Sequence, residues 1–221
     1  FVWENGKKEN EAGRLKVGGN VRYRHSSADQ LSTTNSESFL TSGTNSSFSN
    51  RMNRSKSGNT NVNSNFRLEW SPDTMTRIMF RPNFSFSQNY SDGQSSSVTF
   101  NDNPYTRGMT DPLSQYRDYV SDSIVVNDNR RWSHSDGQSY SVDGMLMVNR
   151  RLNSKGRNLT LRMRGGYSDS DNKSFNISDV NYFLQRKPGG GYDRSYMHQY
   201  NVNPSKSYNG SADLSYSEPL F

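Results

Sequence analysis

The feature that most constrains this chain is a regular alternation of apolar and polar residues in several short segments. Residues 14–25 show it most clearly: apolar or glycine residues occupy every second position from Leu15 to Tyr23, and mainly basic or amide residues lie between them. Successive side chains of a β-strand point to opposite faces, so each segment predicts a strand with one apolar and one polar face. An antiparallel sheet of such strands either covers a soluble core or lies in a membrane.

The alternation recurs often enough to predict an all-β, antiparallel, up-and-down sheet of six or seven strands. Residues 1–3 are expected to be the end of an additional first strand. Pro82 has no backbone N–H, so it predicts a bulge or a weakly paired position within its strand. The six main strands are expected at residues 14–25, 61–70, 76–88, 138–150, 158–168 and 208–217.

Short and long connections are expected to alternate between these strands. The links at 71–75 and 151–157 are short, and Asp73 after Pro72 is typical of a tight turn. Three long polar loops are expected, at 26–60, 89–137 and 169–207. Such loops are uncommon in compact soluble domains but typical of the outer side of outer-membrane barrels. A short helix is expected within 111–123, with Leu113, Tyr116, Tyr119 and Val120.

The composition limits the classes of function. Only 29% of the residues are hydrophobic, which would suit disorder, but the 12% aromatic content argues for structured strands in polar surroundings. The absence of cysteine excludes disulfides and thiolate metal sites. The net charge of +6 is spread over all strands rather than gathered in one patch, so we expect no nucleic-acid partner.

No arrangement of residues predicts catalysis, a cofactor or a metal site. His25, His134 and His198 lie in different segments without the spacing of metal ligands, so surface positions are expected for them. No serine, histidine and aspartate set, and no carboxylate pair, suggests nucleophilic or acid–base chemistry. The sequence therefore predicts that the chain is not an enzyme.

The two faces of the predicted strands assign candidate residues if the apolar face meets lipid. An arginine or lysine on the lipid side costs about 2–4 kcal/mol at the bilayer midplane, which would fix the direction of the faces. Aromatic residues near strand ends (Trp70, Tyr23, Tyr140, Tyr167 and Tyr216) suggest girdles at the membrane boundaries. The lipid-facing candidates are Leu15, Val17, Val21, Tyr23, Phe66, Leu68, Trp70, Ile78, Phe80, Phe84, Phe86, Val142, Leu146, Val148, Leu159, Leu161, Met163 and Leu214.

The polar face would then line the lumen of a barrel. Its arginines could hold a plug through carboxylates or favour anionic solutes. The preferred interpretation is ordinary lumen polarity, with acidic residues balancing the basic ones. The lumen-facing candidates are Arg22, Arg24, Arg67, Glu69, Arg77, Arg81, Asp143, Arg162, Arg164 and Asp213.

Two stretches resemble a known family. The run from Asn65 to Thr76, continued from Ile78 to Ser85, resembles a hairpin of the TonB-dependent-receptor-like outer-membrane β-barrels of Bacteroidetes-type bacteria. The run from Tyr216 to Leu220 is similar to a periplasmic turn of those proteins. The resemblance implies a barrel of about 22 strands in the outer membrane of a Gram-negative bacterium. It also implies membrane lipid, a plug domain, and an energy-coupling protein or surface lipoprotein as partners.

Three functions remain open at this point. The first is a segment of an outer-membrane barrel that takes up a nutrient, in which case this chain is an internal part of a larger barrel, because six or seven strands cannot close one. The second is a non-transporting surface barrel that presents adhesive or assembly loops. The third is a soluble β-sandwich that acts as a binding module.

Overall fold

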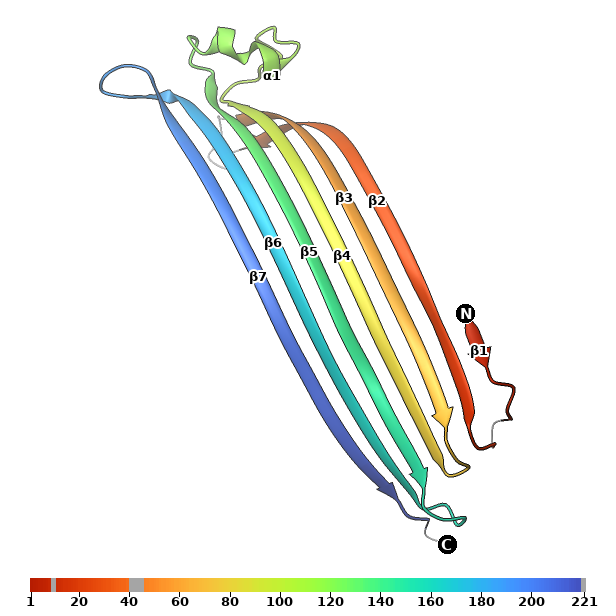
Figure 1. Ribbon diagram of the computed structural model, residues 1–221. Coiled ribbons are helices and arrows are strands. Elements are labelled where there is room, and N and C mark those ends of the chain that lie inside the picture. The colour runs from red at the N-terminus through yellow and green to blue at the C-terminus, as the bar shows by residue number, and fades with distance from the viewer. Residues whose placement is uncertain (9–10, 40–45, 220–221) are drawn as a thin grey trace.

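The computed structural model describes residues 1–8, 11–39 and 46–219, and these form one antiparallel sheet of seven strands. Each strand pairs with its neighbour in the sequence, so the chain runs up and down across the sheet (Figure 1). The elements are β1 (Val2–Glu4), β2 (Arg14–Phe39), β3 (Ser46–Ser71), β4 (Thr76–Phe100), α1 (Pro112–Gln115), the 3₁₀ helix η1 (Tyr116–Tyr119), β5 (Val125–Arg151), β6 (Asn158–Arg186) and β7 (Tyr192–Ser217).

The predicted all-β, up-and-down arrangement is confirmed, and all six main strands lie where the alternation places them. The predicted N-terminal strand is also present, since β1 pairs with β2 through Val2 opposite Gly18. The described strands form a single open sheet with β1 and β7 at its edges. A β-sandwich would need a second sheet, and the described part of the chain has only one.

The prediction of three long loops is wrong. The stretch 26–60 belongs to β2 and β3, apart from residues 40–45, which lie outside the described residues. The stretch 169–207 is also mostly strand, since β6 and β7 are joined only by residues 187–191. Of 89–137, only 101–124 connects strands. In these regions one face mixes large apolar side chains with charged and amide ones, as in the row of Leu31, Arg54 and Trp132. The sequence therefore loses its hydropathy alternation while the backbone stays paired.

The two predicted short turns are present at the lower end of the sheet in Figure 1. In the first, Asp73 Oδ1 accepts hydrogen bonds from the backbone N–H groups of Met75 at 2.7 Å and Thr76 at 2.6 Å. In the second, Asn153 Oδ1 accepts from the N–H groups of Lys155 and Arg157, both at 3.0 Å. A side chain that accepts from backbone two residues later is the usual reason for aspartate and asparagine at such turns.

Pro82 weakens the pairing of β4 on one side only. The pairing of β4 with β5 continues through Pro82 opposite Gly144. The pairing with β3 lapses between Asn65–Asn83 and Leu68–Phe80, although the register is the same on both sides of the gap. The predicted weak position is therefore confirmed, and it involves no bulge. The missing N–H of Pro82 faces β3.

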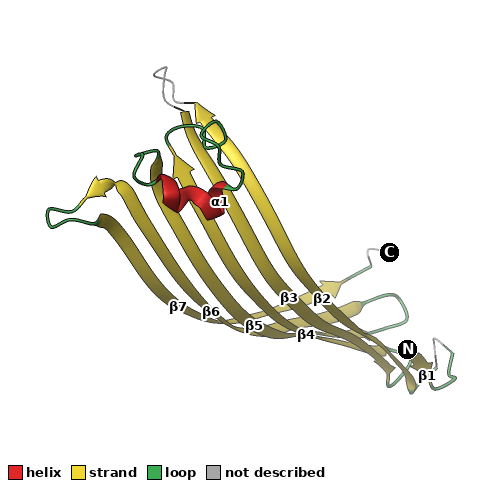
Figure 2. Cartoon of the chain, turned by 90° about the horizontal axis from the view of Figure 1, so that it is seen from above, coloured by secondary structure: helices red, strands yellow, loops and turns green. Residues whose placement is uncertain are grey.

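The insertion between β4 and β5 contains the predicted short helix, as α1 followed by η1. It lies against one face of the upper sheet (Figure 2), where it forms the main hydrophobic cluster. The buried members of that cluster are Val98, Phe100, Met109, Tyr116, Ile124 and Val125. No helix in the part of the chain that the structure describes is long and apolar enough to cross a membrane.

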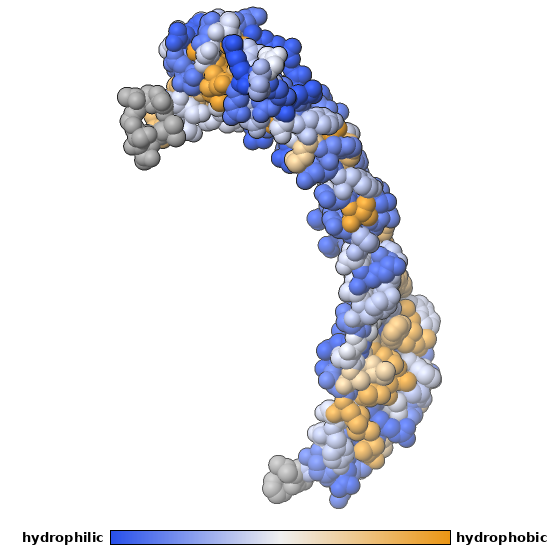
Figure 3. Space-filling model, turned by 90° about the vertical axis from the view of Figure 1, so that its left-hand side faces the viewer, coloured by the Kyte–Doolittle hydropathy of each residue, from blue (hydrophilic) through white to orange (hydrophobic). Residues whose placement is uncertain are grey.

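The sheet is bowed into an arc along its strands (Figure 3). Hydrophobic side chains gather mainly in the lower half of the arc, with a second group beside the insertion at the top. The strands of 25 to 29 residues are about 85–95 Å long at about 3.3 Å per residue. They are therefore far longer than the roughly 9–11 residues that cross a bilayer.

Candidate functional site

The strand register places all eighteen apolar candidates on one face of the sheet. Directly opposed residues of neighbouring antiparallel strands point to the same face. One row across the sheet consists of Leu15, Trp70, Ile78, Val148, Leu161 and Leu214. The next row up consists of Val17, Leu68, Phe80, Leu146, Met163 and Ala212. These rows form a continuous apolar band.

Aromatic residues border this band above and below. At its lower border, Trp70 and Tyr216 lie in adjacent rows. At its upper border, the rings of Tyr140 and Tyr167 are 5.9 Å apart, and those of Tyr167 and Tyr208 are 4.9 Å apart. The ten residues of β6 from Leu159 upward to this border cover about 33 Å of strand, or about 25 Å at a tilt of about 40°. That height is close to the apolar band of outer-membrane barrels.

No second layer covers the apolar band within the described residues. The insertion packs on this same face, but only against the upper parts of β3 to β6. Large side chains of the band are accordingly open, with Val21 at 65%, Phe80 at 42% and Leu214 at 70% exposure. Soluble monomers rarely expose an apolar patch larger than a few hundred Å². The band therefore needs a partner phase or surface.

The opposite face carries all ten lumen-facing candidates. In β2, β3 and β4 they alternate with members of the apolar band, and the register continues this pattern through β5, β6 and β7. The structure thus separates the two predicted residue sets completely. The assignment of the two faces to lipid and lumen stays a prediction.

Glu69 is the best-buried charge on the polar face. Its side chain is 8% exposed and forms ion pairs with Arg67 and with Arg77, the latter at 3.0 Å. Arg77 donates to Glu69 Oε2, so the carboxylate bridges two strands through guanidinium groups. A buried carboxylate is costly unless it is paired in this way. Nearby, Lys16 Nζ lies 2.5 Å from Glu4 Oε1 and ties β1 to β2.

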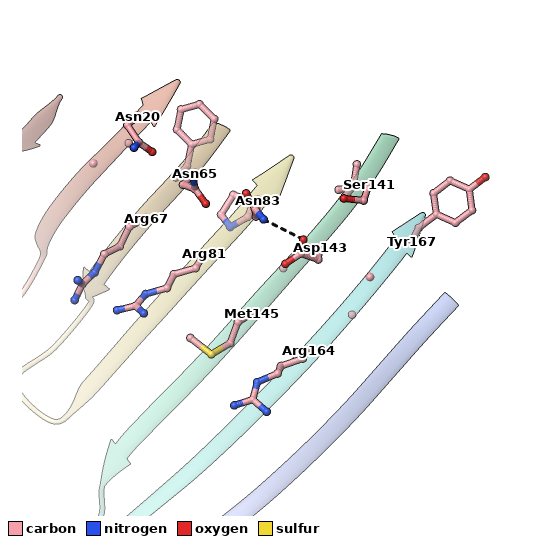
Figure 4. A pocket seen from close by; sticks show the side chains of 18 of the residues that line it. Asn20, Asn65, Arg67, Arg81, Asn83, Ser141, Asp143, Met145, Arg164 and Tyr167 are labelled. Atoms are coloured by element: carbon pink, nitrogen blue, oxygen red, sulfur yellow. Dashed lines mark hydrogen bonds between the residues drawn. The ribbon is translucent and has the colours of Figure 1, made fainter. Parts of the chain in front are cut away.

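Just above these ion pairs, the polar face has a hollow of about 1020 Å³. Gly18 and Gly166 supply no side chains here, so the hollow is floored partly by backbone. Asn83 Nδ2 donates to Asp143 Oδ2 at 3.1 Å across β4 and β5 (Figure 4). The other polar side chains that line it are Asn20, Asn65, Arg67, Arg81, Arg164, Ser141, Ser168 and Asn209.

Three arginines on different strands share one row of this hollow. Arg67 of β3 and Arg81 of β4 are opposed in register, because the pairs Leu68–Phe80 and Asn65–Asn83 flank them. Arg164 of β6 lies in the same row, separated from Arg81 by Met145 of β5. The three side chains extend toward the same end of the sheet in Figure 4. The sequence predicted the arginines on one face but not the hollow, since Gly18 and Gly166 read only as small residues within an alternation.

From the upper rim of the hollow upward, the polar face is built almost entirely of small hydroxyl and amide side chains. One row contains Asn63, Ser85, Ser141, Ser168 and Ser207 next to Arg22. The next contains Asn61, Ser87, Ser139, Ser170 and Ser205 next to Arg24. Hydroxyls pair across strands, as in Ser85 with Ser141 at 2.6 Å. This surface is hydrophilic and nearly uncharged.

The three histidines lie apart. His25 Nδ1 is 2.9 Å from Thr60 Oγ1, His134 Nδ1 is 2.7 Å from Asp92 Oδ1, and His198 stacks edge-on against Phe175 at 4.6 Å. Among the described residues, no three histidine, aspartate or glutamate side chains come together as a metal site would require. The expectation that the chain binds no metal or cofactor and is not an enzyme stays a prediction.

Comparison with known proteins identifies no family. No family model matches the chain, and no curated protein matches it. Among solved structures, the membrane pore complex of pneumolysin is similar over 90% of this chain, at 8% identity and a TM-score of 0.19. The chain spans 32% of that protein's length, and so weak a likeness supports no argument. The resemblance to TonB-dependent-receptor-like barrels therefore stays a prediction.

Proposed function

We propose that this sheet is part of the wall of an outer-membrane β-barrel through which a solute passes. The observation that carries the proposal is the uncovered apolar band, bordered by aromatic residues and backed by a polar face. In such barrels the outward face is an apolar band about 25 Å tall with aromatic girdles, and the interior is polar.

Estimates of free energy indicate whether the apolar band contacts water or lipid. Burial of an apolar side chain is worth about 1.5–3 kcal/mol, so leaving six strands of such side chains in water would be costly. Turning the sheet over would instead place Arg67, Arg81 and Arg164 in lipid, at about 2–4 kcal/mol each near the midplane. Lipid on the apolar face and water on the polar face avoids both costs.

The open edges of the sheet require additional strands in a membrane. Unpaired backbone groups at a lipid-exposed edge cost several kcal/mol each, so only closed barrels are stable there. The smallest bacterial barrels have eight strands, one more than this sheet. We therefore propose that the sheet is a segment of a larger barrel. A plug domain, an energy-coupling protein or a surface lipoprotein would be its partners if the family resemblance holds.

The test compares one charge placed on either face of the same strand. We expect Leu146→Arg, near the middle of the apolar band on β5, to weaken membrane insertion by about 2–4 kcal/mol, the cost of an arginine facing lipid near the midplane. Ser139→Arg, on the polar face of β5, is the matched control and should insert like the unchanged protein. Insertion is measured as the fraction retained in lipid vesicles after extraction at alkaline pH.

Two outcomes would count against the proposal. The first is an unchanged protein that stays in solution without lipid or detergent, which would favour a soluble binding module. The second is equal insertion of the two variants, which would mean that the apolar band does not meet lipid. Neither result depends on which solute the barrel carries.

A second candidate function is a surface barrel that does not transport. The observation that favours it is the length of the strands, which continue about 15 residues above the apolar band and carry the helical insertion. Such a wall would continue for about 50 Å along the strands at about 3.3 Å per residue, which is a height of about 38 Å beyond the membrane at a tilt of about 40°. Uptake of solutes by cells that carry the whole protein, compared with cells that lack it, separates the two functions.

A further inference from the structure

We propose that the hollow on the polar face binds a small oxyanion, of the phosphate or carboxylate class, between Arg81 and Arg164. The first argument is the charge of this face. Between the rows of Arg14 and Arg24, it carries more basic than acidic side chains. The basic ones are Arg14, Lys16, Arg22, Arg24, Arg67, Arg77, Arg81, Arg162 and Arg164, and the acidic ones are Glu4, Glu69, Asp143 and Asp213.

The second argument is how the acidic groups near the hollow are used. Glu4 pairs with Lys16 and, at 3.6 Å, with Arg14. Glu69 pairs with Arg67 and Arg77, and Asp143 accepts from Asn83. Asp213 is opposed in register to Arg162, one row below Arg164. Within the described residues, neither Arg81 nor Arg164 has a carboxylate at ion-pair distance. Both guanidinium groups therefore have all their donors available for a ligand.

The third argument is the position of the arginines relative to one another. Arg67 and Arg81 are directly opposed on neighbouring strands, and like charges in this arrangement destabilise a sheet. Glu69, one row below, neutralises the charge of Arg67 through an ion pair but does not contact Arg81. An anion beside Arg81 would relieve the remaining repulsion.

The fourth argument is size and donor chemistry. Arg81 and Arg164 lie two strands apart, so their backbones are about 10 Å from each other at about 4.8 Å per strand. Arginine forks bind carboxylate and phosphate through two parallel hydrogen bonds. The amides of Asn65 and Asn209 on the same lining offer further donors. The hollow thus suits an anion with several oxygens rather than chloride.

The test uses the full chain purified in a zwitterionic detergent and titrated with inorganic phosphate by calorimetry, against chloride of equal ionic strength. Succinate serves as the carboxylate probe. We expect saturable binding to the unchanged protein and at least tenfold weaker binding to the double variant Arg81→Gln, Arg164→Gln. The double variant Arg22→Gln, Arg24→Gln removes two positive charges from the same face outside the hollow, so its affinity should change less than twofold.

A folding control keeps this test decisive. Because Arg81 repels Arg67, the single variant Arg81→Gln should have a melting temperature no lower than that of the unchanged protein in low salt without phosphate. Added phosphate should raise the melting temperature of the unchanged protein but not that of the variant. Undiminished phosphate binding by the variant Arg81→Gln, Arg164→Gln would overturn the proposal, and so would an equal loss of affinity in the variant Arg22→Gln, Arg24→Gln. So would the absence of saturable binding to the unchanged protein. The binding measurement needs no membrane, so a negative result would leave the barrel proposal standing. Failure of the insertion test would likewise leave the anion-binding proposal standing.

Discussion

Gly19 occupies a position with no room for a side chain. It lies in the middle row of the apolar band, where a Cβ atom would be 2.5 Å from the ring of Phe66 and 2.9 Å from the backbone oxygen of Asn65. The ring can move, but the backbone oxygen is fixed by the sheet. We expect Gly19→Ala to lower the free energy of unfolding by about 1–3 kcal/mol, the usual cost of overpacking.

Gly144 provides the matched control in the same row. A Cβ atom there would have ordinary contacts, 3.6 Å from Phe80 and 3.8 Å from the backbone oxygen of Arg81. Gly144→Ala should leave stability unchanged or raise it slightly, because alanine reduces the freedom of the unfolded chain. Both variants are measured by urea unfolding in detergent. Equal effects of the two substitutions would show that the Phe66 contact does not control this row.

Asp73 shows how a turn residue can make stability depend on pH. Hydrogen bonds from the backbone N–H groups of Met75 and Thr76, and from the Thr76 hydroxyl, hold the pKa of the Asp73 carboxyl below its ordinary value of 3.8. A lowered pKa in the folded state means that the contribution is complete above about 3.8 and is lost as pH falls through the lowered pKa.

We therefore expect Asp73→Asn to flatten the acid end of the stability profile. Asparagine keeps an oxygen that can accept from the backbone, so the turn itself should form. The melting temperature of the unchanged protein should fall more steeply than that of the variant as pH drops below about 4. Parallel profiles for the two proteins would mean that the turn does not stabilise the ionised carboxyl.

At the scale of elements, one buried carboxylate links the helical insertion to the sheet, in addition to the hydrophobic cluster. Asp128 is 3% exposed and accepts from the hydroxyl of Tyr116, and from Asn181 Nδ2 at 2.7 Å. Asp128→Ala leaves these donors without a partner, at a cost of about 1–3 kcal/mol. We expect faster amide hydrogen exchange throughout 101–124, with the lower strands unchanged. Asp136→Ala, at an exposed position on the same face of β5, should leave exchange in the insertion as it was.

The strands were predictable only where one face is apolar. The lower halves, with Leu15, Val17 and their cross-strand partners, alternate in hydropathy and were located correctly. The upper halves alternate in size instead. In β5, Arg130, Trp132 and His134 share one face while Asn129, Ser133 and Ser135 lie on the other, together with Arg131. A hydropathy pattern does not detect this difference in side-chain size, so the upper halves of the strands were predicted as loops.

The candidate site was predictable to the same degree. Alternation alone placed Arg67, Arg81 and Arg164 on the polar face, because each is the neighbour of a band residue. Their common row depends on the register between strands, which the two turns and the pairing of the strands determine, and which is the same on both sides of the gap at Pro82. No local pattern in the sequence encodes that register, so the hollow and the opposition of Arg67 and Arg81 emerged only from the structure.

At the scale of the whole molecule, the open edge at β7 decides whether the sheet belongs to a barrel. The pairing of β7 with β6 is unbroken through Pro204 opposite Asp171, so the missing donor of Pro204 points away from β6. Residues alternate in the direction of their N–H groups along a strand. The N–H groups of His198, Tyr200 and Val202 therefore point to the free edge, and those of Gln199 and Asn201 point to β6.

This geometry gives a direct test of closure in the membrane-inserted protein. All five amides lie well above the apolar band, so lipid does not shield them. If another strand pairs with β7, the amides of His198, Tyr200 and Val202 should exchange with solvent as slowly as those of Gln199 and Asn201. Fast hydrogen exchange at the three outward amides, together with slow exchange at Gln199 and Asn201, would show a free edge. Because an unpaired edge cannot continue down through hydrocarbon, that result would require the strands to separate above the membrane or would exclude the barrel.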